Sequence, residues 1–459
     1  MLQVTGKKVL VIGAARSGIA AVKLLVKHGA HAVLNDLKAE DALGAALDSL
    51  AGSPVELRLG EGPEALLPGA DLVVVSPGVP LTEGLVSACD DLGLPLIGEL
   101  EMAAALTQLP IIAVTGTNGK TTTVSLLGEM FKQSGRVAHV AGNIGYPLSA
   151  AVLRAEDEDI LIAEVSSFQL ETVRDFHPRA AALLNITPDH LNRHGTMDNY
   201  IALKARVFEN QTPADLAVLN LDDSLTRDLA PGIPAQLAYV STTQEVENGA
   251  MLRDGQLILC QEGRERVICS QQDLKLPGIH NVYNALTALT LASFMAVPPQ
   301  VAAYSMRVFE GVEHRIEFVR ELDGIKYFND SKGTNPDATI TAIRSMRAPT
   351  VIILGGFDKK TAFDQLALNV RANPYIKEAV LMGQTAGQIG KALDEAGFTC
   401  HRQAADLKEA VLKAKHLAPP GGNVLFSPAC ASFDQFKDYE QRGRVFKQLV
   451  MALDAPEGS

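Results

Sequence analysis

The stretch that decides the fold of the central region is Val114-Thr115-Gly116-Thr117-Asn118-Gly119-Lys120-Thr121-Thr122. It ends the apolar run of residues 111–114 and leads into a helical pattern that begins near residue 124. A strand, a glycine-bearing turn and a helix form a cradle for phosphate. The turn glycines let backbone N–H groups approach an anion, and the helix N-terminus adds the positive end of its dipole. Lys120 can reach the outer phosphates, and a hydroxyl of Thr121 or Thr122 can bind Mg²⁺.

The match is to a shorter variant of the P-loop, because the strict pattern has a glycine where this chain has Val114. The alternative is an ordinary turn between a strand and a helix. The strand–turn–helix context favours the phosphate site, so we expect the chain to bind and use ATP. The expected phosphate-binding residues are Gly116, Thr117, Asn118, Gly119, Lys120, Thr121 and Thr122.

The composition of the whole chain excludes several classes of protein. Its 459 residues suggest three domains, and 47% hydrophobic with 20% charged residues is typical of ordinary packed cores. The net charge of −12 argues against a nucleic-acid-binding surface. Five scattered cysteines without CxxC spacing indicate reduced thiols, and no signal peptide or apolar run of about 18 residues is present. We therefore expect a cytoplasmic protein without membrane insertion.

Apolar runs alternate with helical patterns along the chain, which is typical of parallel sheets with crossover helices. We predict three α/β domains, residues 1–98, 99–305 and 306–459. Within the second domain, residues 251–270 read as a hairpin with Asp254-Gly255 at its turn, and a helix is predicted over about residues 281–295.

The first predicted strand, residues 9–12, is followed by Gly13-Ala14-Ala15-Arg16-Ser17-Gly18. Asp36 lies at the end of the second predicted strand, residues 32–34. This resembles a dinucleotide fingerprint, but Ala15 replaces the middle glycine, so the indication of NAD is weak. The geometry still suits a nucleotide diphosphate at the helix N-terminus, with an acidic residue on a ribose or base. The alternative for Asp36 is a helix cap.

Polar residues gather at predicted strand ends, where open α/β sheets place their ligands. Glu164 ends an apolar strand, and His190 lies just beyond the next one. A carboxylate and an imidazole beside a Lys-Thr phosphate loop suit Mg²⁺ held by few protein ligands plus phosphate. The alternative for His190 is a loop histidine that makes an ordinary hydrogen bond. Lys204, on a predicted helix, reads from its surroundings in sequence as a solvated lysine.

The third domain has three polar strand-end loops, at residues 329–336, 355–360 and 427–434. The first packs a lysine, a carboxylate and several hydroxyl or amide groups together, which suits an anionic substrate, although a plain turn is the alternative. Cys430 has no identifiable activating base, so we do not expect thiol catalysis.

Several stretches taken together resemble the Mur ligase family, the ATP-dependent amino-acid-adding enzymes of peptidoglycan synthesis. The resemblance covers essentially the whole chain. The phosphate loop alone is shared with folylpolyglutamate synthases. The more specific segments are Gly142-Asn143-Ile144-Gly145, Glu164-Val165-Ser166-Ser167-Phe168-Gln169-Leu170-Glu171, Asp189-His190-Leu191-Asn192-Arg193-His194 and the stretch 427–435.

The resemblance implies a Rossmann-like UDP-binding domain, a central P-loop ATPase-like domain and a C-terminal Rossmann-like α/β domain. It implies a monomeric ligase that adds D-glutamate to UDP-N-acetylmuramoyl-L-alanine through an acyl phosphate, with ATP and two Mg²⁺ ions. The alternatives are a sibling ligase or a folylpolyglutamate synthase with another amino-acid specificity. A non-catalytic nucleotide-binding module and an NAD-dependent dehydrogenase are more distant rivals.

The resemblance also implies roles for individual residues. Catalysis falls to Lys120, Glu164, His190 and Lys204, with Mg²⁺ on Thr121, Glu164, His190 and Lys204. Lys204 matches the family's carbamylated lysine, on which CO₂ forms a carbamate. Further ATP contacts are Asn281, Asn284, Arg315 and Asp330. The UDP-sugar path includes Gly13, Ala14, Arg16, Asp36, Ser76, Gly78 and Asn143, and Ser166 is a further substrate-binding residue. D-Glutamate falls to Lys332, Thr334, Lys360, Ser432 and Tyr439.

Overall fold

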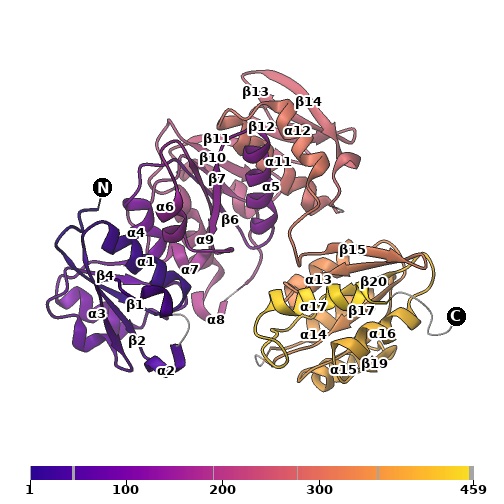
Figure 1. Ribbon diagram of the computed structural model, residues 1–459. Helices are drawn as coiled ribbons and strands as arrows, with labels where there is room; N and C mark the ends of the chain where they lie inside the picture. The colour runs from indigo at the N-terminus through magenta and orange to yellow at the C-terminus, as the bar shows by residue number, and fades with distance from the viewer. Residues whose placement is uncertain (1, 44–46, 190, 277, 359–360, 454–459) are drawn as a thin grey trace. The chain divides into compact units, whose positions relative to one another are not determined.

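The computed structural model describes residues 2–43, 47–189, 191–276, 278–358 and 361–453 (Figure 1). These form two compact units, Met1–Phe309 and Glu310–Ser459. The first unit contains a five-stranded and a nine-stranded sheet, and the second contains a six-stranded sheet. Within the described residues, no helix is both long enough and apolar enough to cross a membrane.

The N-terminal sheet is entirely parallel, with strand order β3-β2-β1-β4-β5. Its central strand is buried on both faces, as expected when crossover helices cover a parallel sheet. The strands are β1 (Lys8–Ile12), β2 (His31–Asp36), β3 (Val55–Leu59), β4 (Leu72–Val75) and β5 (Leu96–Gly98). The α-helices are α1 (Arg16–Lys27), α2 (Glu40–Leu43), α3 (Glu83–Asp91) and α4 (Glu99–Ala105).

The central sheet has the order β14-β13-β12-β11-β10-β9-β6-β8-β7 and is parallel from β7 to β12. Its strands are β6 (Ile111–Thr115), β7 (Ala138–Gly142), β8 (Ile160–Glu164), β9 (Ala180–Leu183), β10 (Leu216–Asn220), β11 (Gln236–Ser241), β12 (Gly249–Arg253), β13 (Gln256–Gln261) and β14 (Arg264–Ser270). Its α-helices are α5 (Lys120–Gln133), α6 (Leu148–Arg154), α7 (Ser167–Leu170), α8 (Leu191–His194), α9 (Met197–Ala205), α10 (Ser224–Arg227), α11 (Ile279–Phe294) and α12 (Pro299–Val308).

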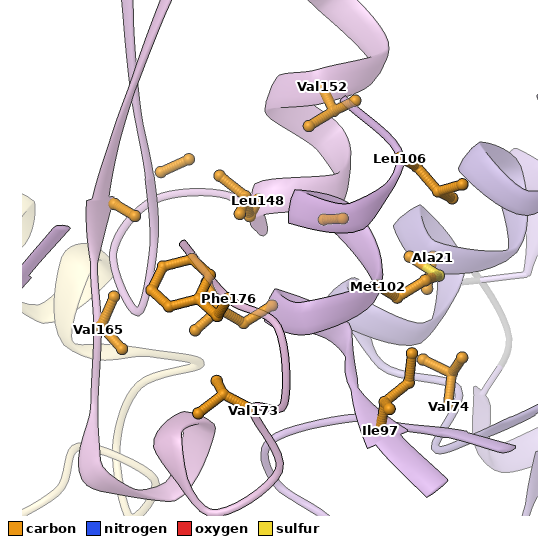
Figure 2. Packing of buried hydrophobic residues seen from close by; sticks show 14 of the residues in the cluster. Ala21, Val74, Ile97, Met102, Leu106, Leu148, Val152, Val165, Val173 and Phe176 are labelled. Atoms are coloured by element: carbon orange, nitrogen blue, oxygen red, sulfur yellow. The ribbon is translucent and has the colours of Figure 1, made fainter. Parts of the chain in front are cut away.

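One apolar cluster joins the N-terminal and central sheets. Figure 2 shows Met102 of α4 and Leu106 just after that helix, together with Leu148 and Val152 of α6, and Phe176 beside them. All five side chains are buried. Because the helices of the two sheets share one core, the two sheets belong to a single compact unit.

The second unit has the strand order β15-β16-β20-β17-β18-β19, in which only β15 is antiparallel to its neighbour. Its strands are β15 (Glu317–Leu322), β16 (Ile325–Asn329), β17 (Thr350–Leu354), β18 (Ile376–Leu381), β19 (His401–Gln403) and β20 (Asn423–Phe426). Its α-helices are α13 (Pro336–Ser345), α14 (Asp364–Ala372), α15 (Ala386–Glu395), α16 (Leu407–Leu417) and α17 (Tyr439–Met451).

The structure confirms the α/β class and extends the predicted hairpin. The turn at Asp254-Gly255 joins β12 to β13 as expected, but the stretch continues into a third antiparallel strand, β14. The predicted helix near residues 281–295 is α11. The two compact units divide between Phe309 and Glu310. The three predicted domain ranges stay a prediction.

A buried carboxylate fastens the edge of the central sheet where β10 begins. The side chain of Asp215 is 3% exposed and accepts hydrogen bonds from His177, Arg179 and Thr212 at 2.7–2.9 Å. Burial alone would raise its pKa, but these hydrogen bonds outweigh burial and lower the pKa to about 2.

Asp215→Asn should therefore lower the free energy of unfolding by about 2 kcal/mol at neutral pH, the usual contribution of hydrogen bonds to a charged group. Because the folded pKa of Asp215 lies below the unfolded value of 3.8, its contribution is complete above that value and lost as the pH falls towards about 2. Urea unfolding at pH 7 and at low pH measures this. Asp228→Asn, at an exposed position, is the control. If the difference in free energy of unfolding between Asp215→Asn and the unaltered protein does not become smaller at low pH, the prediction is wrong.

Candidate nucleotide and metal site

The predicted phosphate loop is the turn between β6 and α5 (Figure 1). Gly119 has a φ of 89°, and a Cβ there would lie 2.3 Å from Asn284 Oδ1. Gly116 has a φ of 144°, and a Cβ there would press on the backbone of Leu184 and Asn185. A side chain at either position would clash with a neighbouring segment, so both positions require glycine. They let the loop lie directly over the strand ends at the N-terminus of α5.

Asn185 holds this loop in shape. The N–H of Asn118 donates to Asn185 Oδ1, and Asn185 Nδ2 donates back to the carbonyl of Asn118. The N–H of Thr117 donates to the carbonyl of Asn185. In this conformation two of the expected phosphate-binding amides are bonded within the protein, and the first turn of α5 remains the anion-facing end, as at any helix N-terminus.

Two lysines meet at one carbonyl of the loop. Lys120 Nζ donates to the carbonyls of Gly116 and Thr117 at 2.8 and 2.9 Å. Lys204 Nζ, from α9, donates to the same Gly116 carbonyl at 2.9 Å. The two amine side chains thus converge at the loop where a polyphosphate would lie.

Glu164 lies at the end of β8, beside the first turn of α5. Its Oε2 accepts a hydrogen bond from Thr121 Oγ1 at 2.8 Å, and its Oε1 accepts one from Asn143 Nδ2 at 3.0 Å. Glu164 and Thr121 are 3% and 2% exposed. The structure thus brings together two predicted metal ligands and one predicted substrate residue.

The donor set fits Mg²⁺ that arrives with a nucleotide. Mg²⁺ prefers oxygen ligands and is usually held by one or two carboxylates, waters and substrate phosphates. A hydroxyl and a carboxylate oxygen stand 2.8 Å apart at Thr121 and Glu164. Among the described residues no group of three or more His, Cys, Asp or Glu is arranged to hold a metal, so an all-protein metal cage is absent there.

Lys204 is 1% exposed, so the interpretation of this residue as a solvated helical lysine is wrong. Its Nζ lies 4.7 Å from the centre of the Tyr200 ring. Burial and the positive charge of Lys120 lower the pKa of Lys204 to about 6, against the opposing attraction of Asp189. The side chain is therefore a neutral, nucleophilic amine at neutral pH.

Asn284 and Asn281 come from the start of α11. Asn284 is buried and its Oδ1 accepts a hydrogen bond from Thr123 Oγ1 at 3.3 Å, while its Nδ2 donates to Asn281 Oδ1 at 3.2 Å. Asn284 therefore lies against the phosphate loop and α5, although it is 161 residues from Thr123 in the chain, and Asn281 is bonded to Asn284.

The predicted UDP-sugar residues of the N-terminal sheet gather at the carboxyl ends of its strands. Asp36 Oδ2 accepts from the N–H of Ala14 at 2.8 Å, and Ser76 Oγ donates to the carbonyl of Gly13 at 3.0 Å. Arg16 and Gly78 are exposed at the same edge. Asp36 Oδ1 also accepts from the N–H of Lys38. Its carboxylate thus bridges two loops, and α1 has no side-chain cap.

Ser166 has a structural role that the sequence did not reveal. Its hydroxyl caps α7 by accepting from the N–H of Gln169, and the Gln169 side chain accepts from the N–H of Ser166. This reciprocal capping box fixes the segment that follows Glu164.

In the second unit, Asp330 lies buried at the end of β16. Its Oδ2 accepts from Ser427 Oγ at 2.6 Å, and its Oδ1 accepts from the N–H of Ile316. Burial raises its pKa to about 6, although Ser427 and the charge of Arg315 oppose this. Arg315 is half-buried and belongs to the same unit as Asp330.

The predicted D-glutamate residues of this unit border a buried arginine. Arg442, 1% exposed, donates to the Ser331 hydroxyl and carbonyl and to the carbonyl of Ala431. It thereby joins the loops that carry Lys332, Thr334 and Ser432. Lys332 Nζ lies 5.9 Å from the ring centre of Tyr439. Cys430 is buried, and burial raises its pKa to about 11, as expected for a thiol with no catalytic role.

His190 and Lys360 lie outside the described residues, so their predicted roles are untested. The sequence reasoning missed Asn185, Tyr200 and Arg442. Asn185 follows a buried strand, and the rule that ligands gather at strand ends could have found it. Tyr200 and Arg442 lie on helices with no local pattern that distinguishes them.

Three family models match the chain. They are described as "Mur ligase MurD-like, N-terminal domain" over residues 7–98, "Mur ligase middle domain" over 114–292 and "Mur ligase, glutamate ligase domain" over 314–430. A curated protein of Pelotomaculum thermopropionicum, named UDP-N-acetylmuramoylalanine–D-glutamate ligase, is 49% identical over 98% of both chains. The chain belongs to the Mur ligase family. A Mur ligase of Caldanaerobacter subterraneus with the same name is 45% identical, over 98% of this chain and 100% of its own.

Solved structures of Mur ligases share the fold. UDP-N-acetylmuramate-alanine ligase MurC from Thermotoga maritima has a TM-score of 0.60 at 17% identity, over 98% of this chain and 100% of its own. MurF from Acinetobacter baumannii has a TM-score of 0.61 at 15% identity, over 96% and 93%. These likenesses establish the three-sheet Mur ligase fold of this chain.

Proposed function

We propose that this chain is an ATP-dependent, ADP-forming ligase that adds D-glutamate to UDP-N-acetylmuramoyl-L-alanine in peptidoglycan precursor synthesis. The observation that carries the proposal is the grouping of half-buried Lys120 with buried Thr121, Glu164 and Lys204 around one phosphate loop. The substrate assignment rests on the names of relatives that are 42–49% identical over nearly their whole length.

The reaction has two steps. The terminal phosphoryl group of ATP passes to the carboxylate of the L-alanyl residue, which gives an acyl phosphate and ADP. The amine of D-glutamate then attacks the acyl carbon, an amide bond forms, and phosphate leaves. Such chemistry depends on positioning and charge neutralisation and needs no protein nucleophile.

Lys120 and the first turn of α5 would hold the ATP phosphates, and Thr121 and Glu164 would hold Mg²⁺, together with His190. Mg²⁺, when bound, neutralises the charge of the phosphates and the acyl group. Asn281, Asn284, Arg315 and Asp330 are proposed to contact the nucleotide. Glu164 is already oriented by Asn143, which we assign to the UDP-linked substrate.

Lys204 is proposed to act as a carbamate. A neutral amine attacks CO₂, forms an N–C bond and releases one proton, which leaves an anionic carbamate. The low pKa of Lys204 supplies the neutral amine at physiological pH. The change of sign matters because an ammonium group would repel Mg²⁺, whereas a carbamate can bind or orient it.

The other substrates are assigned to two strand-end clusters. The UDP-sugar falls to Gly13, Ala14, Arg16, Asp36, Ser76, Gly78, Asn143 and Ser166 in the first unit. D-Glutamate falls to Lys332, Thr334, Lys360, Ser432 and Tyr439 in the second. We further propose a monomer that works in the cytoplasm, where ATP and UDP-sugars are made.

The test is ATP-dependent phosphate release with UDP-N-acetylmuramoyl-L-alanine and a panel of amino acids. We expect release with D-glutamate and none with L-glutamate or diamino acids. Release with another amino acid would favour a sibling ligase, and release with a folate substrate instead of the UDP-sugar would favour a folylpolyglutamate synthase.

A further inference from the structure

A carboxylate beyond the end of β10 collects an unusual number of hydrogen bonds. Asp222 Oδ1 accepts from the hydroxyls of Ser241 and Thr243, each at 2.7 Å. Asp222 Oδ2 accepts from the N–H of Thr242 and from the hydroxyl of Tyr283, each at 2.7 Å. We call these five residues the Asp222 cluster. Its partners come from the last residue of β11, the segment after it and α11, so the cluster joins separate parts of the chain at the carboxyl edge of the central sheet.

Tyr283 is the only member of the Asp222 cluster that lies on a helix. Its hydroxyl donates to Asp222 and accepts from Thr242 Oγ1 at 2.7 Å. Burial, with the nearby carboxylate of Asp222, raises the pKa of Tyr283 to about 12, so the hydroxyl keeps its proton at neutral pH. The ring is half-buried, and the phenol oxygen is bonded on both sides.

The start of α11 needs such an anchor. The residue before it, Gly278, has a φ of 98° and supplies no side-chain cap. Asn281 and Asn284 occupy the first two turns. Asn284 accepts a hydrogen bond from Thr123 and lies against Gly119 of the phosphate loop. Adjacent residues on a helix point about 100° apart, so Tyr283 and Asn284 hold the helix from two different sides.

The apolar body of α11 is already secured by buried residues such as Ala285, Leu286 and Leu289. The hydroxyl of Tyr283 therefore contributes little to the apolar packing of α11. Its hydrogen bonds instead fix the orientation of the first turns of the helix. The cluster lies at the carboxyl ends of parallel strands, where open α/β sheets bind their ligands.

We propose that Tyr283, held by Asp222, is a positioning residue for the nucleotide: it fixes the first turns of α11 so that Asn281 and Asn284 face the phosphate loop. This inference rests on the proposed function of the same site. The residue acts through the two asparagines and does not itself contact the nucleotide.

The test is Tyr283→Phe, which removes one oxygen atom and keeps the ring. We expect the affinity for ADP with Mg²⁺, measured by titration calorimetry, to fall about tenfold, within the range for loss of one hydrogen bond. Tyr304→Phe on α12 is the matched control, because that ring is 52% exposed. It should leave ADP binding unchanged.

Steady-state kinetics separate positioning from a purely structural role. Tyr283→Phe should raise KM for ATP and leave KM for D-glutamate and for the UDP-linked substrate unchanged. Combined with Asn284→Ala, it should add little further loss, because both changes break one unit. Equal ADP affinity in Tyr283→Phe and the unaltered protein, or fully additive effects, would overturn the inference. If the unaltered protein binds no ADP, the proposed function itself is wrong.

Discussion

Replacing Lys204 by alanine should reduce kcat about a thousandfold, at the upper end of the effects seen when one preorganised charged group is lost from an active site. Lys204 is buried against the Gly116 carbonyl, and the shortened side chain leaves its place beside the phosphate loop empty. Neither an amine nor a carbamate would then act there. Phosphate release under saturating substrates measures the loss.

Added carboxylates distinguish the carbamate from the amine. If Lys204 works as a carbamate, formate or acetate should enter the space left in Lys204→Ala and restore part of the activity, whereas methylamine should not. Removal of CO₂ should slow the unaltered enzyme. Lys132→Ala is the control, because that side chain is 76% exposed on α5. Rescue by amines and not by carboxylates would refute the carbamate.

Glu164→Gln should reduce kcat by about two to three orders of magnitude, as expected when a preorganised charge in the site is removed. The change keeps the shape of the side chain but removes the negative charge proposed to bind Mg²⁺. It also turns one acceptor into an NH₂ group, which would face either the Thr121 hydroxyl or the Asn143 amide.

The Mg²⁺ dependence of turnover identifies the cause. In Glu164→Gln the Mg²⁺ concentration for half-maximal activity should rise, while the melting temperature stays close to that of the unaltered protein. Glu156→Gln, at an exposed position before β8, should behave like the unaltered enzyme. A fall in kcat without any change in Mg²⁺ dependence would place Glu164 outside the metal site.

Contiguous patterns determined the parts of this protein that sequence reasoning predicted. The phosphate loop, the apolar strand that ends at Glu164 and the helix that carries Asn281 and Asn284 each occupy a short stretch with its own periodicity and turn residues. Two strands lack such a pattern: the residues of β3 and β15 are exposed or half-buried, so their apolar periodicity is weak.

The tertiary structure alone decided the environment of the reactive groups. Lys204 looks like a solvated lysine in its own helix, and it is buried only because the fold brings it to Gly116, 88 residues away. Its low pKa follows from that burial and from Lys120. Tyr283 likewise has no distinguishing neighbour in the sequence. Its partner is Asp222, 61 residues away, which accepts a hydrogen bond from its hydroxyl. Strand, turn and helix are encoded locally by side-chain periodicity, whereas burial and charge at a site depend on residues that only the packed sheets bring together.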